Sequence, residues 1–155
     1  TVKGGAYVRA IKRFKPDTEV VQLPCQVFVA LAEEGWINSP ATLAASAHYL
    51  GPLFQGPAQP DTLVLGCTHF PVLADAIRRT VGSDVALVDS ALTTAEAVAE
   101  ALAAKGLASA PGSEDAGTVR FFATDSPERF ARVGAIFLNR AIDPAIVELV
   151  DLWTF

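Results

Sequence analysis

The sequence predicts an α/β protein in which a parallel sheet is flanked by helices. Short apolar runs typical of strands alternate with longer segments of helical periodicity, and strands that are separated by helices pair in parallel. The chain has 155 residues, about the length of one ordinary domain. Because 51% of these residues are apolar, the chain can bury a sizeable core.

The first part of the chain predicts one helix and one strand. Thr1 is placed to cap a helix over residues 4–14. This helix ends before Pro16, because the residue that precedes a proline avoids helical angles. Residues 19–23, with the sequence EVVQL, are rich in β-branched residues and predict a short strand.

Two helices and a loop are predicted next. Apolar residues recur at helical spacing over 27–31, and Gly35 suits the C-terminal cap of that helix. Ser39 followed by a proline is typical of a helix start, which predicts a second helix over 40–50. Glycines and prolines then predict a loop over 51–60.

Strands and helices continue to alternate in the rest of the chain. The remaining strands are predicted over residues 61–66, 85–88, 118–123 and 146–149. The remaining helices are predicted over residues 71–81, from Thr93 or Thr94 to 105, and from Ser126-Pro127 onward. Small and polar residues over 106–117 predict a mobile connection.

Composition argues against several classes of function. The net charge is -5 and no cluster of Lys and Arg could follow a phosphate backbone, so a nucleic-acid partner is not expected. No run approaches the about 18 apolar residues of a membrane span, and no signal peptide is present. The two cysteines have no CxxC spacing, which favours a reducing cytosol, and two histidines are too few for a metal site.

The loop over residues 66–70, GCTHF, combines three chemical functions between a predicted strand and a predicted helix. Ligands bind beyond the carboxyl ends of strands in an open parallel sheet. Gly66 allows a sharp turn, and Cys67 would stand near the positive end of the helix, where thiolates are favoured. Thr68 offers a hydroxyl and an N–H group to a carboxylate, and a histidine such as His69 exchanges protons near neutral pH. Taken alone, these residues also fit an incidental cluster.

Five segments, in order along the chain, resemble the glutamate racemase family. They are TVKGGAY (1–7), LPCQVFVALAEEGW (23–36), LVLGCTHFPVL (63–73), VDSA (88–91) and FFATDSPERF (121–130). The third is close to the most specific motif of the family. Its histidine favours glutamate over aspartate racemases, in which that position usually holds an acidic residue. The resemblance runs essentially end to end and matches the C-terminal part of the family's chain.

The resemblance implies cofactor-independent racemisation of L-glutamate to D-glutamate, which is needed for peptidoglycan. Two cysteines on opposite faces of the α-carbon would act as general acid and base. Cys67 matches the second cysteine, which acts on L-glutamate, and His69 would assist it. Glu33 would be a carboxylate near that pair. Thr68, His69 and Thr1 would bind the substrate.

The resemblance also implies the arrangement of the enzyme. Residues 1–90 would form the second lobe of a two-lobed racemase, and residues 91–155 would return to the first lobe, the rest of which is absent. A bacterial, cytoplasmic homodimer is expected, with glutamate and the missing N-terminal half as partners. The first cysteine of the family precedes Thr1, so we expect one half-site here and no activity from the isolated chain. Gly4 stands where the family usually has serine.

Two alternatives remain open at this point. The first is a racemase for another amino acid, such as aspartate, which relative rates on L-glutamate and L-aspartate would distinguish. The second is a non-catalytic binding module of the same fold. A Cys-Asn-Thr loop in the upstream sequence would favour the enzyme over the module.

Overall fold

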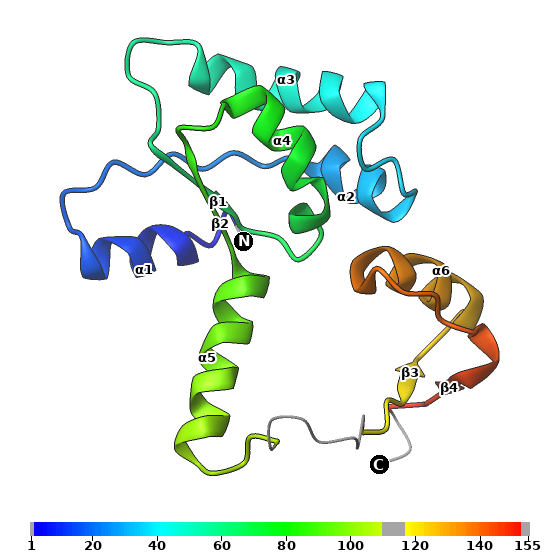
Figure 1. The fold of residues 1–155 in the computed structure, drawn as a ribbon. Helices are drawn as coiled ribbons and strands as arrows, with labels where there is room; N and C mark the ends of the chain where they lie inside the picture. Colours follow the sequence, from blue (N-terminus) through cyan, green and yellow to red (C-terminus); the bar gives the residue numbers. More distant parts are fainter. Residues whose placement is uncertain (1, 110–116, 153–155) are drawn as a thin grey trace. The chain divides into compact units, whose positions relative to one another are not determined.

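The computed structural model describes residues 2–109 and 117–152 of the chain. Helices alternate with small parallel sheets, which confirms the predicted α/β class (Figure 1). The chain divides into two compact units, Thr1–Glu96 and Ala97–Phe155. The assignment of residues 1–90 and 91–155 to two racemase lobes stays a prediction.

The first unit is built around a two-stranded parallel sheet. Its elements are α1 (Ala6–Phe14), α2 (Gln26–Glu33), α3 (Pro40–Phe54), β1 (Thr62–Leu65), the 3-10 helix η1 (Phe70–Leu73), α4 (Ala74–Val81) and β2 (Ala86–Asp89). Strands β1 and β2 pair from Thr62 opposite Ala86 to Leu65 opposite Asp89, and α4 provides the crossover between them.

The core of this unit lies where α2, α3, η1 and α4 meet. Its largest fully buried apolar side chains are Phe28, Leu73 and Ile77, one from each of α2, η1 and α4. The ring of Phe28 meets Tyr49 of α3 edge-on, with 5.5 Å between the ring centroids. These contacts fix the loop between β1 and η1 against α2.

Ser39 begins α3, as predicted. Its hydroxyl accepts a hydrogen bond from the N–H of Thr42 at 3.2 Å, and a proline follows at the first helical position. The helix continues to Phe54, so the loop predicted over 51–54 is wrong. Leu50 and Phe54 lie one turn apart and are both buried, and this packing outweighs the poor helical propensity of the glycine and proline between them.

A line of buried hydroxyl groups joins α3 to α4. Thr42 and Ser46 are fully buried, and the hydroxyl of Thr80 donates to that of Ser46 at 2.7 Å. The hydroxyl of Thr42 donates to the carbonyl of Trp36. No buried side-chain nitrogen or oxygen among the described residues lacks a partner, so this polar contact between helices carries no desolvation penalty of an unpaired group.

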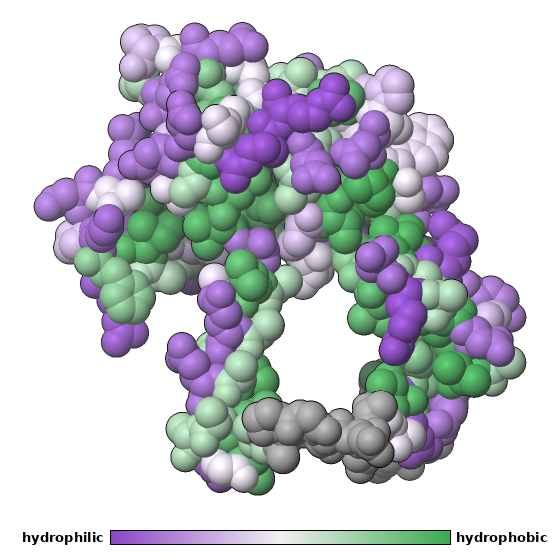
Figure 2. Space-filling view, viewed as in Figure 1, coloured by the Kyte–Doolittle hydropathy of each residue, from purple (hydrophilic) through white to green (hydrophobic). Residues whose placement is uncertain are grey.

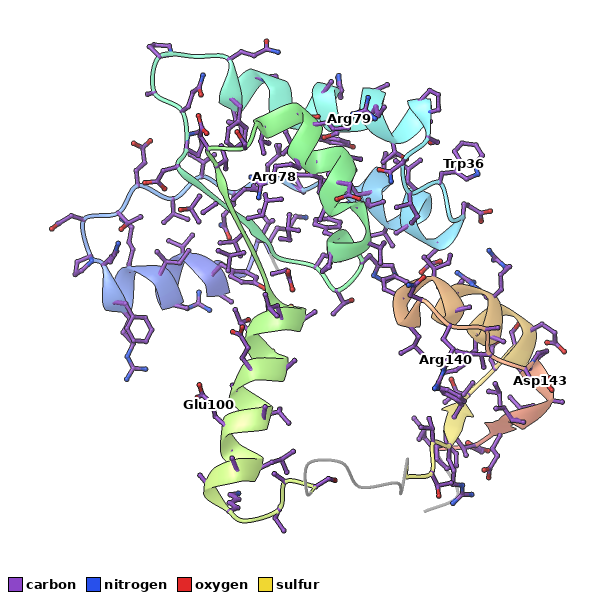
Figure 3. All side chains as sticks on the ribbon, viewed as in Figure 1. Trp36, Arg78, Arg79, Glu100, Arg140 and Asp143 are labelled. Carbon is purple, nitrogen blue, oxygen red and sulfur yellow. The ribbon has the colours of Figure 1, made fainter. Side chains whose placement is uncertain are left out.

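The end of α4 is tied to β2 by Arg78. Its Nη1 donates to the carbonyl of Gly82 at 3.0 Å and also to the carbonyl of Val85 (Figure 3). Gly82 has a φ of 89°, a conformation that side-chain-bearing residues rarely adopt. The tight turn from helix to strand therefore depends on this glycine and on the guanidinium group that fills the turn.

Residues 19–23 form no strand, which corrects the prediction made from EVVQL. The backbone of this segment pairs with neither β1 nor β2, and the side chains of Val21 and Leu23 are exposed. An apolar segment becomes a strand only through hydrogen bonds to a neighbouring strand. The described part of the chain offers no neighbour at this segment.

Helix α5 (Ser90–Ala104) begins earlier than predicted. Asp89 caps it in place of Thr93 or Thr94, because its carboxylate accepts hydrogen bonds from the N–H groups of Ala91 and Leu92 at 2.9 Å each. None of its residues is buried, and Figure 2 shows hydrophobic and hydrophilic groups side by side along it. No helix in the described ranges has both the length and the apolar character to traverse a bilayer.

The second unit contains another two-stranded parallel sheet. Its further elements are β3 (Phe121–Ala123), α6 (Pro127–Leu138), the 3-10 helix η2 (Pro144–Ile146) and β4 (Val147–Leu149). Strand β3 pairs with β4, and Ala131, Ile142 and Val147 form a small core beneath them. The connection predicted over 106–117 lies mostly outside the described residues.

Two details of the second unit refine the predictions. Ser126 precedes α6 as predicted, but its φ is 40° and its side chain makes no capping hydrogen bond.

Arg120 donates two hydrogen bonds to Glu148 across the sheet, at 2.9 and 2.8 Å. The side-chain hydrogen bond from Arg120 lowers the pKa of the Glu148 carboxyl. Both groups are exposed to solvent, so the pair adds little to the stability of the sheet.

The cap at Ser39 can be tested by replacing it with alanine. Ser39→Ala removes the acceptor for the N–H of Thr42 and should lower the free energy of unfolding by about 1 kcal/mol. Urea denaturation followed by circular dichroism measures this loss. Ser83→Ala, the same change at an exposed turn, is the control and should stay within about 0.5 kcal/mol of the parent. Equal losses in the two variants would show that the cap contributes nothing.

Candidate functional site

The candidate site is the loop that follows β1 at the carboxyl end of the small sheet. Leu65 is buried, and the next residue, Gly66, turns the backbone so that its N–H donates to the carbonyl of Val64 at 3.0 Å. Cys67, Thr68 and His69 come directly after this turn, which agrees with the predicted place of the site in a parallel sheet.

A side chain at position 66 would be tightly packed, because an aromatic ring occupies the space beside Gly66. A Cβ atom at this position would lie 3.0 Å from Cε2 of Tyr7, tighter than nine in ten real Cβ contacts. Tyr7 belongs to α1, so that helix packs its ring directly on the loop. The sequence pattern alone does not place Tyr7 at the site. Its only signal is the aromatic end of the TVKGGAY segment, and the contact is tertiary.

The loop leads into a 3-10 helix, which corrects the prediction of an α-helix over 71–81. The segment Phe70–Leu73 is 3-10 helical, and α-helical geometry begins at Ala74. Cys67 therefore does not lie in the first turn of an α-helix, and the predicted stabilisation of a thiolate by a helix dipole does not apply to it. The group that can polarise the thiol of Cys67 is instead the side chain of His69.

Glu33 reaches the loop because α2 packs on η1. The rings of Phe28 and Phe70 meet edge-on with 5.4 Å between their centroids, and Leu73 beside them is fully buried. Glu33 is the last residue of α2, about a turn and a half beyond Phe28 on the same helix. The apolar contact thus brings together two polar residues that are 36 positions apart in the sequence.

Glu33 and His69 form the shortest polar contact of the site. Nε2 of His69 lies 3.1 Å from Oε1 of Glu33, and the two side chains are 26% and 27% exposed. An ionised carboxylate only accepts hydrogen bonds, so Nε2 is the nitrogen that carries the proton. In the neutral imidazole the other nitrogen, Nδ1, is then an acceptor.

The acceptor nitrogen of His69 faces the thiol of Cys67. The distance from Sγ to Nδ1 is 3.9 Å, which is long for direct proton transfer. The hydroxyl of Thr68 lies 3.4 Å from the same nitrogen. The structure therefore brings together four of the predicted site residues, namely Glu33, Cys67, Thr68 and His69. Thr1, predicted to bind substrate, lies outside the described residues.

The other cysteine is in a different environment. Cys25 is buried, its thiol donates to the carbonyl of Leu23 at 3.8 Å, and burial raises its pKa. It behaves as a small apolar residue. Within the described ranges, no three His, Cys, Asp or Glu side chains are grouped so that they could hold a metal ion.

The two thiols should differ in reactivity. Cys67 is half-buried and faces His69, whereas Cys25 is buried and its raised pKa disfavours the reactive thiolate. We expect iodoacetamide at pH 7 to modify Cys67 at least about tenfold faster than Cys25. Mass spectrometry of timed samples measures both rates, and the difference should vanish in urea. Equal labelling in the folded protein would contradict the assignment of environments.

The contact between Gly66 and Tyr7 predicts a coupled pair of substitutions. Gly66→Ala should lower the free energy of unfolding by about 1–3 kcal/mol, because its methyl group overpacks against the ring. In a Tyr7→Ala background the same change should cost clearly less. Urea denaturation of the two single variants and the double variant measures this coupling. Strictly additive losses would mean that the ring does not restrict residue 66.

Comparison with known proteins supplies the family context. No family model matches the chain. The glutamate racemase of Geobacter metallireducens is 46% identical to it over 139 residues, which cover 90% of this chain and 50% of that relative. The glutamate racemase of Neisseria meningitidis is 43% identical over 152 residues, which cover 98% of this chain and 54% of the relative.

A solved structure agrees with the sequence relatives. The glutamate racemase of Francisella tularensis in complex with D-glutamate superimposes with a TM-score of 0.83 and 28% identity, over 100% of this chain and 56% of that one. The chain thus spans about half the length of the relatives it matches. In sequence and fold, the chain is thus homologous to about half of a glutamate racemase.

Proposed function

We propose that this chain supplies one half of a cofactor-independent active site that interconverts L-glutamate and D-glutamate. The observation that carries the proposal is the Glu33–His69–Cys67 arrangement at the carboxyl end of β1. Support comes from the glutamate racemases that match this chain, one of which is solved with D-glutamate. A half-buried thiol beside a histidine that is held by a carboxylate is an arrangement suited to proton transfer.

In this proposal Cys67 is the base for L-glutamate. The Sγ–H bond breaks, the proton passes to Nδ1 of His69, and the thiolate takes the α-proton of the substrate. Glu33 keeps its hydrogen bond to Nε2 and stabilises the imidazolium that forms. Thr68, whose side chain is exposed next to the thiol, binds the substrate through its hydroxyl.

Racemisation needs a second acid on the opposite face of the α-carbon. A single thiol can remove a proton and return it to the same face, which gives exchange without inversion. Cys25 does not suit this role, because it is buried and its pKa is raised. We therefore propose that the second group comes from a part of the enzyme outside this chain, consistent with the half-length match to the relatives.

The wider setting follows from the same proposal. The enzyme would supply D-glutamate for peptidoglycan in a bacterial cytoplasm and would act as a homodimer. Light scattering of the complete enzyme tests the dimer. Rates on L-glutamate and L-aspartate test the substrate, and comparable rates on both would contradict a racemase for glutamate.

Hydrogen exchange at the α-carbon tests the role of Cys67 in the complete enzyme. In deuterated water, Cys67→Ser should lose exchange into L-glutamate by at least about a hundredfold, because a serine hydroxyl is a far weaker acid than a thiol. Exchange into D-glutamate should fall less, since a different group faces that enantiomer. NMR of the α-proton of each pure enantiomer reports both rates.

The 155-residue chain alone and Cys25→Ser are the controls for this experiment. The chain alone should show no racemisation by circular dichroism, and Cys25→Ser should exchange L-glutamate at the parent rate. Unchanged exchange of L-glutamate in Cys67→Ser would rule out Cys67 as the base.

A further inference from the structure

The acceptor nitrogen of His69 has two neighbouring donors. Nδ1 lies 3.4 Å from the hydroxyl oxygen of Thr68 and 3.9 Å from the sulfur of Cys67. With Nε2 donating to Glu33, Nδ1 has a single lone pair in the plane of the ring. One lone pair accepts one hydrogen bond well. The hydroxyl and the thiol therefore compete for it.

Neither donor holds the nitrogen at an ideal distance. A hydroxyl that donates to nitrogen or oxygen usually lies at about 2.7–3.0 Å, and the contact from Thr68 is longer than this. The contact from Cys67 is near the upper limit for a hydrogen bond that involves the larger sulfur atom. The hydroxyl is nonetheless the closer and the stronger donor, because an S–H group donates weakly. In the absence of a ligand, the balance thus favours Thr68 over Cys67 as the donor to Nδ1.

We propose that Thr68 restrains Cys67 by occupying Nδ1 of His69 and that an anionic ligand releases this restraint. The side chain of Thr68 is exposed, so its hydroxyl is free to turn towards a carboxylate oxygen in the site. A carboxylate is a stronger acceptor than an imidazole nitrogen at this distance, since charge-assisted hydrogen bonds are the strong ones. Once the hydroxyl has turned, Nδ1 accepts the thiol proton and leaves a thiolate and an imidazolium.

This inference rests on the proposed function for the identity of the ligand, but not for the competition itself. The competition is argued from contacts among residues 67–69 and Glu33, which the structure describes together in one unit. It links substrate binding to the formation of the base: the thiolate would form when a carboxylate is present to use it. An unliganded site would keep its cysteine in the less oxidisable thiol form.

Alkylation of the chain without any substrate tests the competition. Thr68→Val keeps the shape of the side chain and removes the hydroxyl. At pH 7 it should raise the rate of Cys67 modification by iodoacetamide about two- to tenfold, the factor that one net hydrogen bond is worth. Thr68→Ser keeps the hydroxyl and should stay near the parent rate. Thr62→Val, the same change at an exposed position of β1, should leave the rate unchanged.

A His69→Ala background separates competition from simple access to the thiol. There Thr68→Val should have no effect, because the shared nitrogen is gone. Slow labelling of Cys25 in each sample reports that the chain is folded, and Thr68→Ala replaces Thr68→Val if that variant labels Cys25 rapidly.

Two results would overturn the proposal. One is a rate for Thr68→Val that equals or falls below the parent rate. The other is an acceleration that persists without His69 or appears equally in Thr68→Ser. The racemase assignment fails by a different result, the absence of α-hydrogen exchange in the complete enzyme, so the two failures can be told apart.

Discussion

The contact between α2 and η1 is the constraint on which the site depends. Phe28 and Leu73 are buried and Phe70 closes against Phe28, so the end of α2 is held beside the loop that follows β1. Burying a large apolar side chain is worth about 1.5–3 kcal/mol, whereas an ion pair open to solvent is worth about 1 kcal/mol or less and a partly exposed pair little more. The apolar contact therefore positions Glu33 against His69, and the polar contact follows from it.

Because the apolar contact contributes more to stability than the polar one, the main role of the polar residues is not to hold the fold together. Glu33 and His69 are each about a quarter exposed, so their hydrogen bond adds little to folding. Its effect is on the imidazole: it fixes the proton on Nε2 and presents Nδ1 to the loop. The proposed competition between Cys67 and Thr68 as donors rests on this tautomer.

Local signals in the sequence predicted most elements of the first unit but not their partners. Ser39 with its following proline, and Gly35 with a φ of 72°, act within one turn of backbone and were sufficient to place helix ends. The extension of α3 to Phe54 and the absence of a strand over 19–23 depend on packing and pairing between distant segments. The composition of a short stretch of sequence carries no information about contacts between distant segments.

The residues of the site likewise divide into those that the sequence predicts and those that depend on tertiary contacts. The loop residues 67–69 are adjacent, so their proximity follows from the sequence itself, and Glu33 was predicted only through the family resemblance. The ring of Tyr7 beside Gly66 follows from neither. This ring favours glycine at the start of the loop: a Cβ atom there would pack tightly against it, and either the ring or the turn that leads to Cys67 would have to shift slightly.

Solvent exposure of the loop limits the proton transfer that is proposed for it. An ion pair of thiolate and imidazolium is weak where water surrounds it, because the interaction between charges about 4 Å apart is only about 1 kcal/mol at the dielectric constant of water and about 4 kcal/mol at an effective value of 20. With Glu33 and His69 open to solvent, the proposed proton transfer gains little from this chain by itself. A surface that covered the loop would exclude water, strengthen each of these contacts, and bring a second acid to the opposite face of the substrate. The same covering surface would thus supply both the dielectric and the geometry that a two-sided reaction requires.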